Sequence, residues 1–203
     1  MKVLGITGGT GSGKSTAAEY LISKGFACVD ADQIGIELTA VGQPVLEIIK
    51  NELGAVAYDN NASGNGLVLD RKALASAVFT DEKKRIRFDG IIHGEMIKII
   101  DRKIAEFKCR DEYRGILLDA PLLFEAGIDD RCDAVILVTA DTETRIRRIV
   151  ERDGISEEDA VNRINSQMSD EAKIELADFV VDNSGSTDWL KAQLDEIIAG
   201  AGL

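Results

Sequence analysis

Five short hydrophobic runs recur along this chain and predict the strands of a sheet. They lie at Lys2–Ile6, Phe26–Val29, Ile116–Asp119, Ala134–Val138 and Asp178–Val181. Most of them are followed at once by turn-forming residues or by an acid, and segments with helical periodicity lie between them. Continuous hydrophobic runs are typical of strands that are covered on both faces, as in parallel sheets. The pattern therefore predicts an α/β fold, a doubly wound parallel sheet of these five strands.

One connection is too long for a single crossover. More than eighty residues, from about Gln33 to Arg114, separate the second run from the third, whereas a crossover needs about a dozen. This stretch has helical patterns of its own at Pro44–Leu53 and Lys84–Phe107, and a turn rich in Gly and Asn at Asn60–Gly66. We therefore predict three parts: a core of residues 1–32, 113–140 and 174–203, an inserted helical subdomain at 33–112, and a two-helix lid at 141–173.

Charge and cysteine content narrow the class of protein. The 203 residues include 24 Lys and Arg against 36 Asp and Glu, a formal charge of −12, which argues against nucleic-acid binding as the main task. Three scattered cysteines, Cys28, Cys109 and Cys132, argue against a disulfide framework or a structural zinc site. No hydrophobic run approaches the roughly 18 residues of a membrane span, and the first run is too short for a signal peptide. We expect a cytoplasmic protein that does not bind membranes, either a monomer or a weak homo-oligomer.

The strongest chemical signal is the segment Gly8–Ser15, GGTGSGKS, which we call the phosphate loop. It matches the pattern G-x-x-x-x-G-K-[ST] at every fixed position. Glycines let the backbone curl so that its N–H groups can point at phosphate oxygens, and the helix expected next adds its positive dipole end. Lys14 can contact the β- and γ-phosphates of ATP, and the hydroxyl of Ser15 can bind Mg²⁺. A flexible glycine turn is the alternative, but the strand before the loop and the amphipathic helix after it favour a nucleotide site.

Acidic residues close two of the other predicted strands. The second run leads into Asp30-Ala31-Asp32, and the third ends at Asp119. Because the carboxyl ends of strands in such a sheet face the ligand crevice, we expect these acids near the phosphate loop. In an extended segment Asp30 and Asp32 share one side, where a carboxylate can accept the proton of an attacking hydroxyl, and Asp119 can support Mg²⁺. The alternative for Asp32 is a capping role at the next helix.

Three arginines, Arg145, Arg148 and Arg152, have the spacing i, i+3, i+7 and would share one face of a helix. In an acidic chain, such a row can neutralise a phosphoryl group during transfer, from a lid that closes over it, and Arg148 is the first candidate. The alternative is a solvated helix whose arginines pair with neighbouring acids such as Asp153. The chain lacks the guanine-binding tetrapeptide N-K-x-D, and its acidic charge and helical insert favour a small-molecule kinase over a switch or a nucleic-acid motor.

Together these motifs resemble the dephospho-CoA kinase family. The resemblance extends from residue 5 to about residue 190 and rests on Gly8–Thr16, Asp30-Ala31-Asp32, PLLFE at Pro121–Glu125, ERDG at Glu151–Gly154, and Ala177-Asp178 followed by DNSG at Asp182–Gly185. It implies ATP-dependent phosphorylation of the ribose 3′-hydroxyl of dephospho-CoA, the last step of coenzyme A biosynthesis. It also implies a nucleotide-binding core, a helical subdomain that binds the CoA substrate, and a lid.

The resemblance implies a role for each matching residue. The catalytic residues would be Asp32, as the base on the acceptor hydroxyl, with Lys14 and Arg148. ATP would be held by Gly9, Thr10, Gly11, Ser12, Gly13, Lys14, Ser15, Thr16, Arg148, Asn183 and Gly185. The substrate side would comprise Asp30, Asp32, Arg71, His93, Pro121, Leu122, Leu123 and Glu125. The Mg²⁺ ligands would be Ser15 and Asp119.

Three positions depart from the pattern usual in this family. An arginine is usual where Ile36-Glu37 stands, so Arg71, Arg85 or Arg87 would have to supply that substrate contact. Gly94 follows His93 where proline is usual, which frees the local backbone. Arg145 stands where a glutamine is common, which adds charge and leaves the mechanism unchanged.

Two other functions fit parts of the sequence. A kinase for nucleosides or nucleoside monophosphates would share the core but not the PLLFE segment at Pro121–Glu125. A nucleotide-binding regulator without an acceptor would use closure of the lid as a signal. Asp32 and the arginine row argue against the regulator, because a regulator needs no acceptor base.

Overall fold

In a computed structural model, the chain forms two compact units. The structure describes residues 1–54, 57–59 and 66–200. The first unit comprises Met1–Asp30 and Ile104–Leu203, and the second comprises Ala31–Lys103. The second unit corresponds to the insert predicted at 33–112, but its end falls inside a long helix that continues into the first unit. No helix in the described part of the chain is long and apolar enough to cross a membrane.

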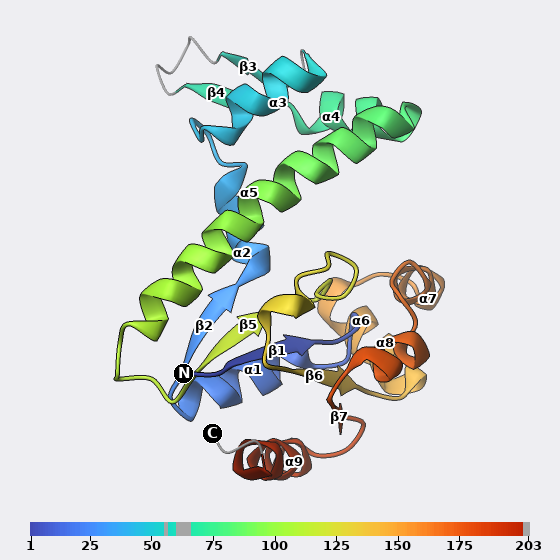
Figure 1. The fold of residues 1–203 in the computed structure, drawn as a ribbon. Helices are drawn as coiled ribbons and strands as arrows, with labels where there is room; N and C mark the ends of the chain where they lie inside the picture. Colours follow the sequence, from blue (N-terminus) through green and yellow to red (C-terminus); the bar gives the residue numbers. More distant parts are fainter. Residues whose placement is uncertain (55–56, 60–65, 201–203) are drawn as a thin grey trace. The chain divides into compact units, whose positions relative to one another are not determined.

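The first unit is built on a parallel sheet of five strands in the order β2-β5-β1-β6-β7 (Figure 1). The strands are β1 Val3–Thr7, β2 Phe26–Asp30, β5 Gly115–Asp119, β6 Ala134–Thr139 and β7 Phe179–Asp182. Every pairing in this sheet is parallel. β1, from which the phosphate loop leads, is the central strand and is buried along its whole length. The predicted five-stranded, doubly wound sheet is confirmed, and each strand lies within one residue of its expected position.

Helices lie between these strands and after the last of them. They are α1 Lys14–Ser23, α6 Thr142–Asp153, α7 Glu157–Asn165, α8 Asp170–Leu176 and α9 Thr187–Gly200, with a 3-10 turn at Asp129–Arg131. Leu21 of α1 and Leu194 of α9 join the hydrophobic cluster that contains Leu117 of β5. The connection from β6 to β7 holds three helices, so the prediction of two was wrong. The reason is that Ser169 caps a separate helix, α8, where its Oγ accepts from the N–H of Ala172 at 3.3 Å.

The second unit has a hydrophobic core of its own. Its elements are α2 Ala31–Leu38, α3 Val45–Leu53, β3 Ala57–Asp59, β4 Leu67–Leu69, α4 Arg71–Thr80 and α5 Glu82–Lys108, which the unit includes as far as Lys103. Leu46 and Ile49 of α3 are fully buried, and Phe88 of α5 packs against their cluster. The antiparallel pair β3–β4 was not predicted, because three-residue strands are too short to show alternation. The turn predicted at Asn60–Gly66 lies, apart from Gly66, outside the described residues.

Two neighbouring residues of α1 test how the helix packs on the sheet. Leu21 is fully buried, whereas Ile22 is 43% exposed. We expect Leu21→Ala to lower the free energy of unfolding by about 2–5 kcal/mol, because it removes buried surface and leaves a cavity. Ile22→Ala serves as the matched control and should change it by about 0.5 kcal/mol. Urea unfolding followed by circular dichroism measures both values, and equal losses would contradict the packing described.

Candidate active site

The phosphate loop has the curled backbone that its sequence predicts. Gly11 and Gly13 have φ angles of +83° and +86°, a region that residues with a side chain rarely adopt. The N–H of Ser12 donates to the carbonyl of Gly9 at 3.0 Å. Helix α1 begins at Lys14, so the positive end of its dipole lies at the end of the loop. The loop therefore has the backbone conformation of an anion site at a helix N-terminus, and its binding of phosphate stays a prediction.

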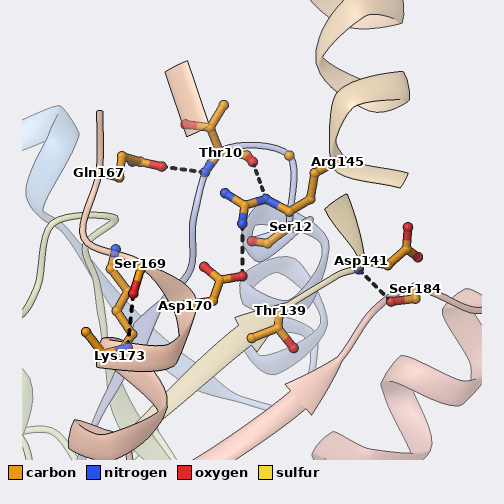
Figure 2. Close-up of polar contacts among 12 residues, drawn as sticks. Thr10, Ser12, Thr139, Asp141, Arg145, Gln167, Ser169, Asp170, Lys173 and Ser184 are labelled. Carbon is orange, nitrogen blue, oxygen red and sulfur yellow. Dashed lines mark hydrogen bonds and ion pairs between the residues drawn. The ribbon is translucent and has the colours of Figure 1, made fainter. Parts of the chain in front are cut away.

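Arg145 and Gln167 hold the first half of the loop (Figure 2). Arg145 Nε donates to the carbonyl of Thr10 at 2.9 Å, and Gln167 Oε1 accepts from the N–H of Thr10 at 2.8 Å. Arg145 is only 5% exposed, and its Nη1 pairs with Asp170 Oδ2 at 2.9 Å. A Cβ at Gly9 would collide with the Arg145 guanidinium. Arg145 is therefore a support of the loop, a role that its spacing alone did not predict.

Arg148 and Asn183 hold the second half of the loop. Arg148 Nη1 donates to the carbonyls of Gly11 and Ser12, each at 3.3 Å, and its Nη2 donates to the carbonyl of Asn183 at 2.9 Å. Asn183 Nδ2 donates to the carbonyl of Ser12 at 2.7 Å. A Cβ at Gly13 would collide with this amide. Arg148 thus lies against carbonyl groups of the loop, and its role at the transferred phosphoryl group stays a prediction.

The turn after β7 connects this region to the start of α6. Ser184 Oγ accepts from the N–H of Asp141, the residue that caps α6, at 2.8 Å (Figure 2). Ser186 Oγ accepts from the N–H of Trp189 at 3.2 Å, in the first turn of α9. Gly185, predicted to contact ATP, lies in the same turn. Asn183 therefore contacts the phosphate loop and Gly185 lies in the turn that follows it, and their contact with ATP stays a prediction.

Arg152, the third arginine of the row, lies differently. Its Nε and Nη2 donate to the two carboxylate oxygens of Asp153 at 2.7 and 2.9 Å, and Arg163 Nη1 donates to the same group at 2.6 Å. The pKa of the Asp153 carboxyl lies below its usual value, because the hydrogen bonds from Arg152, and to a smaller extent Arg163, stabilise its charged form. The Arg152 side chain is 61% exposed. This is the surface pairing named above as the alternative for the arginine row.

Asp30 and Asp119 lie side by side at the carboxyl ends of two strands. They are register partners in the pairing of β2 with β5, and Asp119 is also the register partner of Ile6 in β1. Lys14 Nζ forms an ion pair with Asp119 Oδ1, and both side chains are mostly buried. The phosphate-loop lysine and a strand-end carboxylate are therefore in direct contact, at the edge of the sheet where the sequence placed them.

The thiol of Cys28, on β2, has a pKa that burial and these charges shift. Burial raises the pKa of its thiol to about 11, with Asp119 and Asp30 adding to the rise and Lys14 opposing it. A thiol with this pKa stays protonated at neutral pH, and the thiolate is the nucleophilic form. Cys28 therefore takes no part in the chemistry proposed below.

The oxygen groups near the loop suit Mg²⁺. Ser15 supplies a hydroxyl in the first turn of α1, and Asp119 supplies a carboxylate. Mg²⁺ prefers oxygen ligands and is usually bound by one or two protein groups together with waters and substrate phosphates. Within residues 1–54 and 66–200, no group of three or more His, Cys, Asp or Glu could hold a metal unaided. The donor set therefore fits an ion that arrives with a nucleotide.

Asp32 does not lie in an extended segment, so that expectation was wrong. β2 ends at Asp30 and α2 begins at Ala31, which puts Asp32 in the first helical turn. Side-chain alternation holds only within an extended segment, so it no longer predicts that Asp30 and Asp32 share a side. A carboxylate in the first turn is also favoured by the helix dipole. The role of Asp32 as a base stays a prediction.

The other predicted substrate residues of the second unit lie on α4 and α5. Arg71 is the first residue of α4 and is exposed. Arg85 pairs with Glu82 at 3.6 Å and Arg87 with Glu52 at 3.3 Å. Both pairs are largely exposed, and such pairs contribute little to stability, so either arginine can change partner at low cost. All three remain candidates for the missing arginine contact.

His93 is half-buried on α5, next to the glycine that replaces the usual proline. The helix continues without a break through Gly94 for 27 residues in all. A proline at this position would lack the backbone N–H and would clash with the preceding turn. Gly94 is therefore compatible with a continuous helix around His93.

The loop after β5, residues 121–127, places its side chains in different surroundings. Leu123 is fully buried, whereas Leu122 is 49% exposed. Glu125 Oε1 forms an ion pair with Lys173 Nζ at 2.9 Å. Leu122 is thus better placed for a substrate contact than Leu123, and the carboxylate of Glu125 has an internal partner. Nothing in the sequence indicated this partner, because a single lysine on a helix is usually exposed.

Most of the chain matches a known family. Residues 2–188 match the family model described as dephospho-CoA kinase. The chain belongs to the dephospho-CoA kinase family. A dephospho-CoA kinase of Corynebacterium glutamicum is 38% identical over 199 residues, which span 98% of this chain and 99% of that protein. One from Fusobacterium nucleatum subsp. nucleatum is 39% identical over 188 residues, spanning 93% and 92%.

Solved structures share the fold of this family member. TT1252 from Thermus thermophilus is 33% identical, with a TM-score of 0.76 over 98% of this chain and 97% of that one. The dephospho-CoA kinase from Campylobacter jejuni is 24% identical, with a TM-score of 0.69 over 98% and 96%. A shikimate kinase from Acinetobacter baumannii has a TM-score of 0.52 at 14% identity, covering 100% and 96%. The last two likenesses concern the fold alone, which is that of P-loop kinases.

Gly13 and Gly154 test why the loop needs glycine. Both have positive φ angles, +86° and +66°, but a Cβ at Gly154 would meet nothing within 4 Å, whereas one at Gly13 would displace Asn183. We expect both alanine variants to lose about 1–2 kcal/mol of stability from backbone strain. Only Gly13→Ala should weaken ADP binding, by about tenfold or more, equivalent to ~1.4 kcal/mol. Thermal unfolding and titration calorimetry measure these effects, and equal loss of binding in both variants would contradict the steric explanation.

Proposed function

We propose that this chain transfers the γ-phosphate of ATP to the ribose 3′-hydroxyl of dephospho-CoA and so forms coenzyme A. The observation that carries the proposal is the family match over residues 2–188. The curled loop on β1 and the position of Lys14 at its end support it, because phosphoryl transfer needs a phosphate site with a cation beside it. We place the reaction in the cytoplasm, with the enzyme a monomer or a weak homo-oligomer.

The donor side follows from the loop and its neighbours. Backbone N–H groups and the dipole of α1 bind the phosphates, and Lys14 exchanges its contact with Asp119 for phosphate oxygens when ATP arrives. Asp119 and the Ser15 hydroxyl would hold the Mg²⁺ that arrives with the nucleotide. When bound, Mg²⁺ neutralises charge that develops between the β- and γ-phosphates. Thr16 lies one residue further along α1, and Asn183 and Gly185 lie beside the loop towards the adenine.

The acceptor side rests on the residues that match the family. Asp32 orients the 3′-hydroxyl and accepts its proton, and Asp30 shapes the same pocket from the end of β2. The segment 33–112, with Arg71 and His93, binds the CoA part of the substrate, and Pro121 and Leu122 are further substrate contacts. Segment 141–173 forms the lid, whose Arg148 already lies against the phosphate loop and would neutralise the transferred phosphoryl group from there. The remaining residues, 1–32, 113–140 and 174–203, form the nucleotide-binding core.

A panel of acceptors tests the proposal against its alternatives. The protein is incubated with ATP, Mg²⁺ and either dephospho-CoA, nucleosides or nucleoside monophosphates, and ADP release and product mass are measured. We expect rapid ADP release only with dephospho-CoA, with coenzyme A as the product. Faster turnover with a nucleoside or nucleotide would establish the related kinase instead. ATP consumption that ignores every acceptor would favour the regulator.

Two variants of α2 test whether Asp32 is the catalytic base. Asp32→Asn keeps the size of the side chain but removes the proton acceptor, so we expect kcat to fall by about 10²- to 10⁴-fold. Glu37→Gln is the matched control, because Glu37 is an acid of the same helix, α2, where it accepts from Gln33 Nε2 at 3.0 Å. It should retain the turnover of the unmodified enzyme. Near-normal turnover of Asp32→Asn, with unchanged circular dichroism, would reject Asp32 as the base.

A further inference from the structure

Lys173 of α8 is a charged side chain with no exposed surface. Its Nζ pairs with Glu125 Oε1 at 2.9 Å and donates to the carbonyl of Pro121 at 3.4 Å. The same carbonyl accepts from the hydroxyl of Thr7, at the end of β1, at 3.1 Å. Burying a charge is costly even when it is paired, and a hydrophobic residue of similar size often serves stability better. The pair therefore points to a task at the loop after β5 beyond filling the core.

Asp170 lies one turn earlier on α8 and is connected to the other loop of the site. Its Oδ2 pairs with Arg145 Nη1, and Arg145 Nε binds the carbonyl of Thr10 (Figure 2). Gln167, just before α8, accepts from the N–H of the same Thr10. The N–H of Thr10 is thus held by Gln167, which lies just before α8. The carbonyl of Thr10 is held by Arg145, which forms an ion pair with Asp170 of α8.

We propose that α8 is the positioning element of the site, holding the phosphate loop through Asp170 and the loop after β5 through Lys173. This inference rests on the proposed function, in which the first loop binds ATP and the second lines the substrate. Asp170 and Lys173 have the spacing i, i+3 and therefore share a helix face, about 4.5 Å apart along the axis. A single rigid turn then fixes the two loops relative to each other. Asp170 acts on the phosphate loop through Arg145, and Lys173 acts on the loop after β5 through Glu125 and the carbonyl of Pro121.

The proposal also gives Arg145 a specific task. A glutamine, the common residue at this position in the family, could still donate to the carbonyl of Thr10, but it would leave Asp170 without its charged partner. Arg145 supplies the hydrogen bond and the ion pair together, at 5% exposure. Truncating one member of such a buried pair leaves the other charge uncompensated, which makes both ends of the connection sensitive to mutation.

Two variants of α8 should separate the two substrates. Asp170→Asn weakens the hold on the phosphate loop, so we expect the KM for ATP and the Kd for ADP to rise by about tenfold. The KM for dephospho-CoA should stay within about twofold. Lys173→Met weakens the hold on the loop after β5 and should give the reverse, a rise of about tenfold in the KM for dephospho-CoA with little change in nucleotide affinity.

Further variants separate positioning from loss of folding. Lys173→Met combined with Glu125→Gln removes both charges of the buried pair, so that neither is left uncompensated, and it should show the same rise in the KM for dephospho-CoA. Lys24→Met is the matched control, because Lys24 forms a more exposed ion pair with Asp195 in the same unit. It should change neither KM. Circular dichroism and thermal unfolding establish that each variant is folded.

The outcome that overturns the proposal is a set of folded variants in which both KM values rise together, or in which only thermal stability falls. Titration with ADP needs no acceptor, so it measures the Asp170 connection even if dephospho-CoA is not the substrate. An unmodified protein that phosphorylates no dephospho-CoA would reject the proposed function. An unchanged Kd for ADP in Asp170→Asn would reject the positioning role of α8.

Discussion

The carbonyl groups of the phosphate loop are bound by side chains from distant parts of the chain, and the order of the site depends on this contact. A glycine-rich loop loses much conformational entropy when it folds, so something must hold it. Arg145 and Arg148 from α6 and Asn183 from the end of β7 bind the carbonyls of Thr10, Gly11 and Ser12. Because carbonyls are engaged, N–H groups elsewhere in the loop can serve an anion. The loop is thus organised before a nucleotide binds.

The same contact gives the glycines a second reason to be glycine. The sequence pattern explains them by curvature and by access to phosphate. In the structure, a Cβ at Gly9 would collide with Arg145 and one at Gly13 with Asn183, so supporting groups also approach the backbone too closely for a side chain. Curvature is a local property that a motif can encode. Close packing of a distant arginine is not, and only the fold reveals it.

Local features leave a pattern in the sequence, whereas contacts between distant residues do not. This decides how much of the structure could be predicted from the sequence. The strands were predicted to within a residue because buried parallel strands leave continuous hydrophobic runs, and Asp119 followed from its place at a strand end. Asp32 was misplaced because no helix breaker separates it from β2, so α2 begins immediately at Ala31. Lys173 and Asp170 were missed because their partners, Glu125 and Arg145, are 48 and 25 residues away and no local pattern joins them.

The arrangement of charge in the first unit explains how so acidic a chain can attract ATP. Lys14 is paired with Asp119, Arg145 with Asp170 and Lys173 with Glu125, so each of these cations is compensated by an acid. Arg148 instead donates to three backbone carbonyls, which are dipoles rather than full charges. Its positive charge is therefore offset by dipoles alone in these three contacts. The remaining attraction comes from the N–H groups of the loop and the dipole of α1, which need no net positive charge on the protein and act only over a short range.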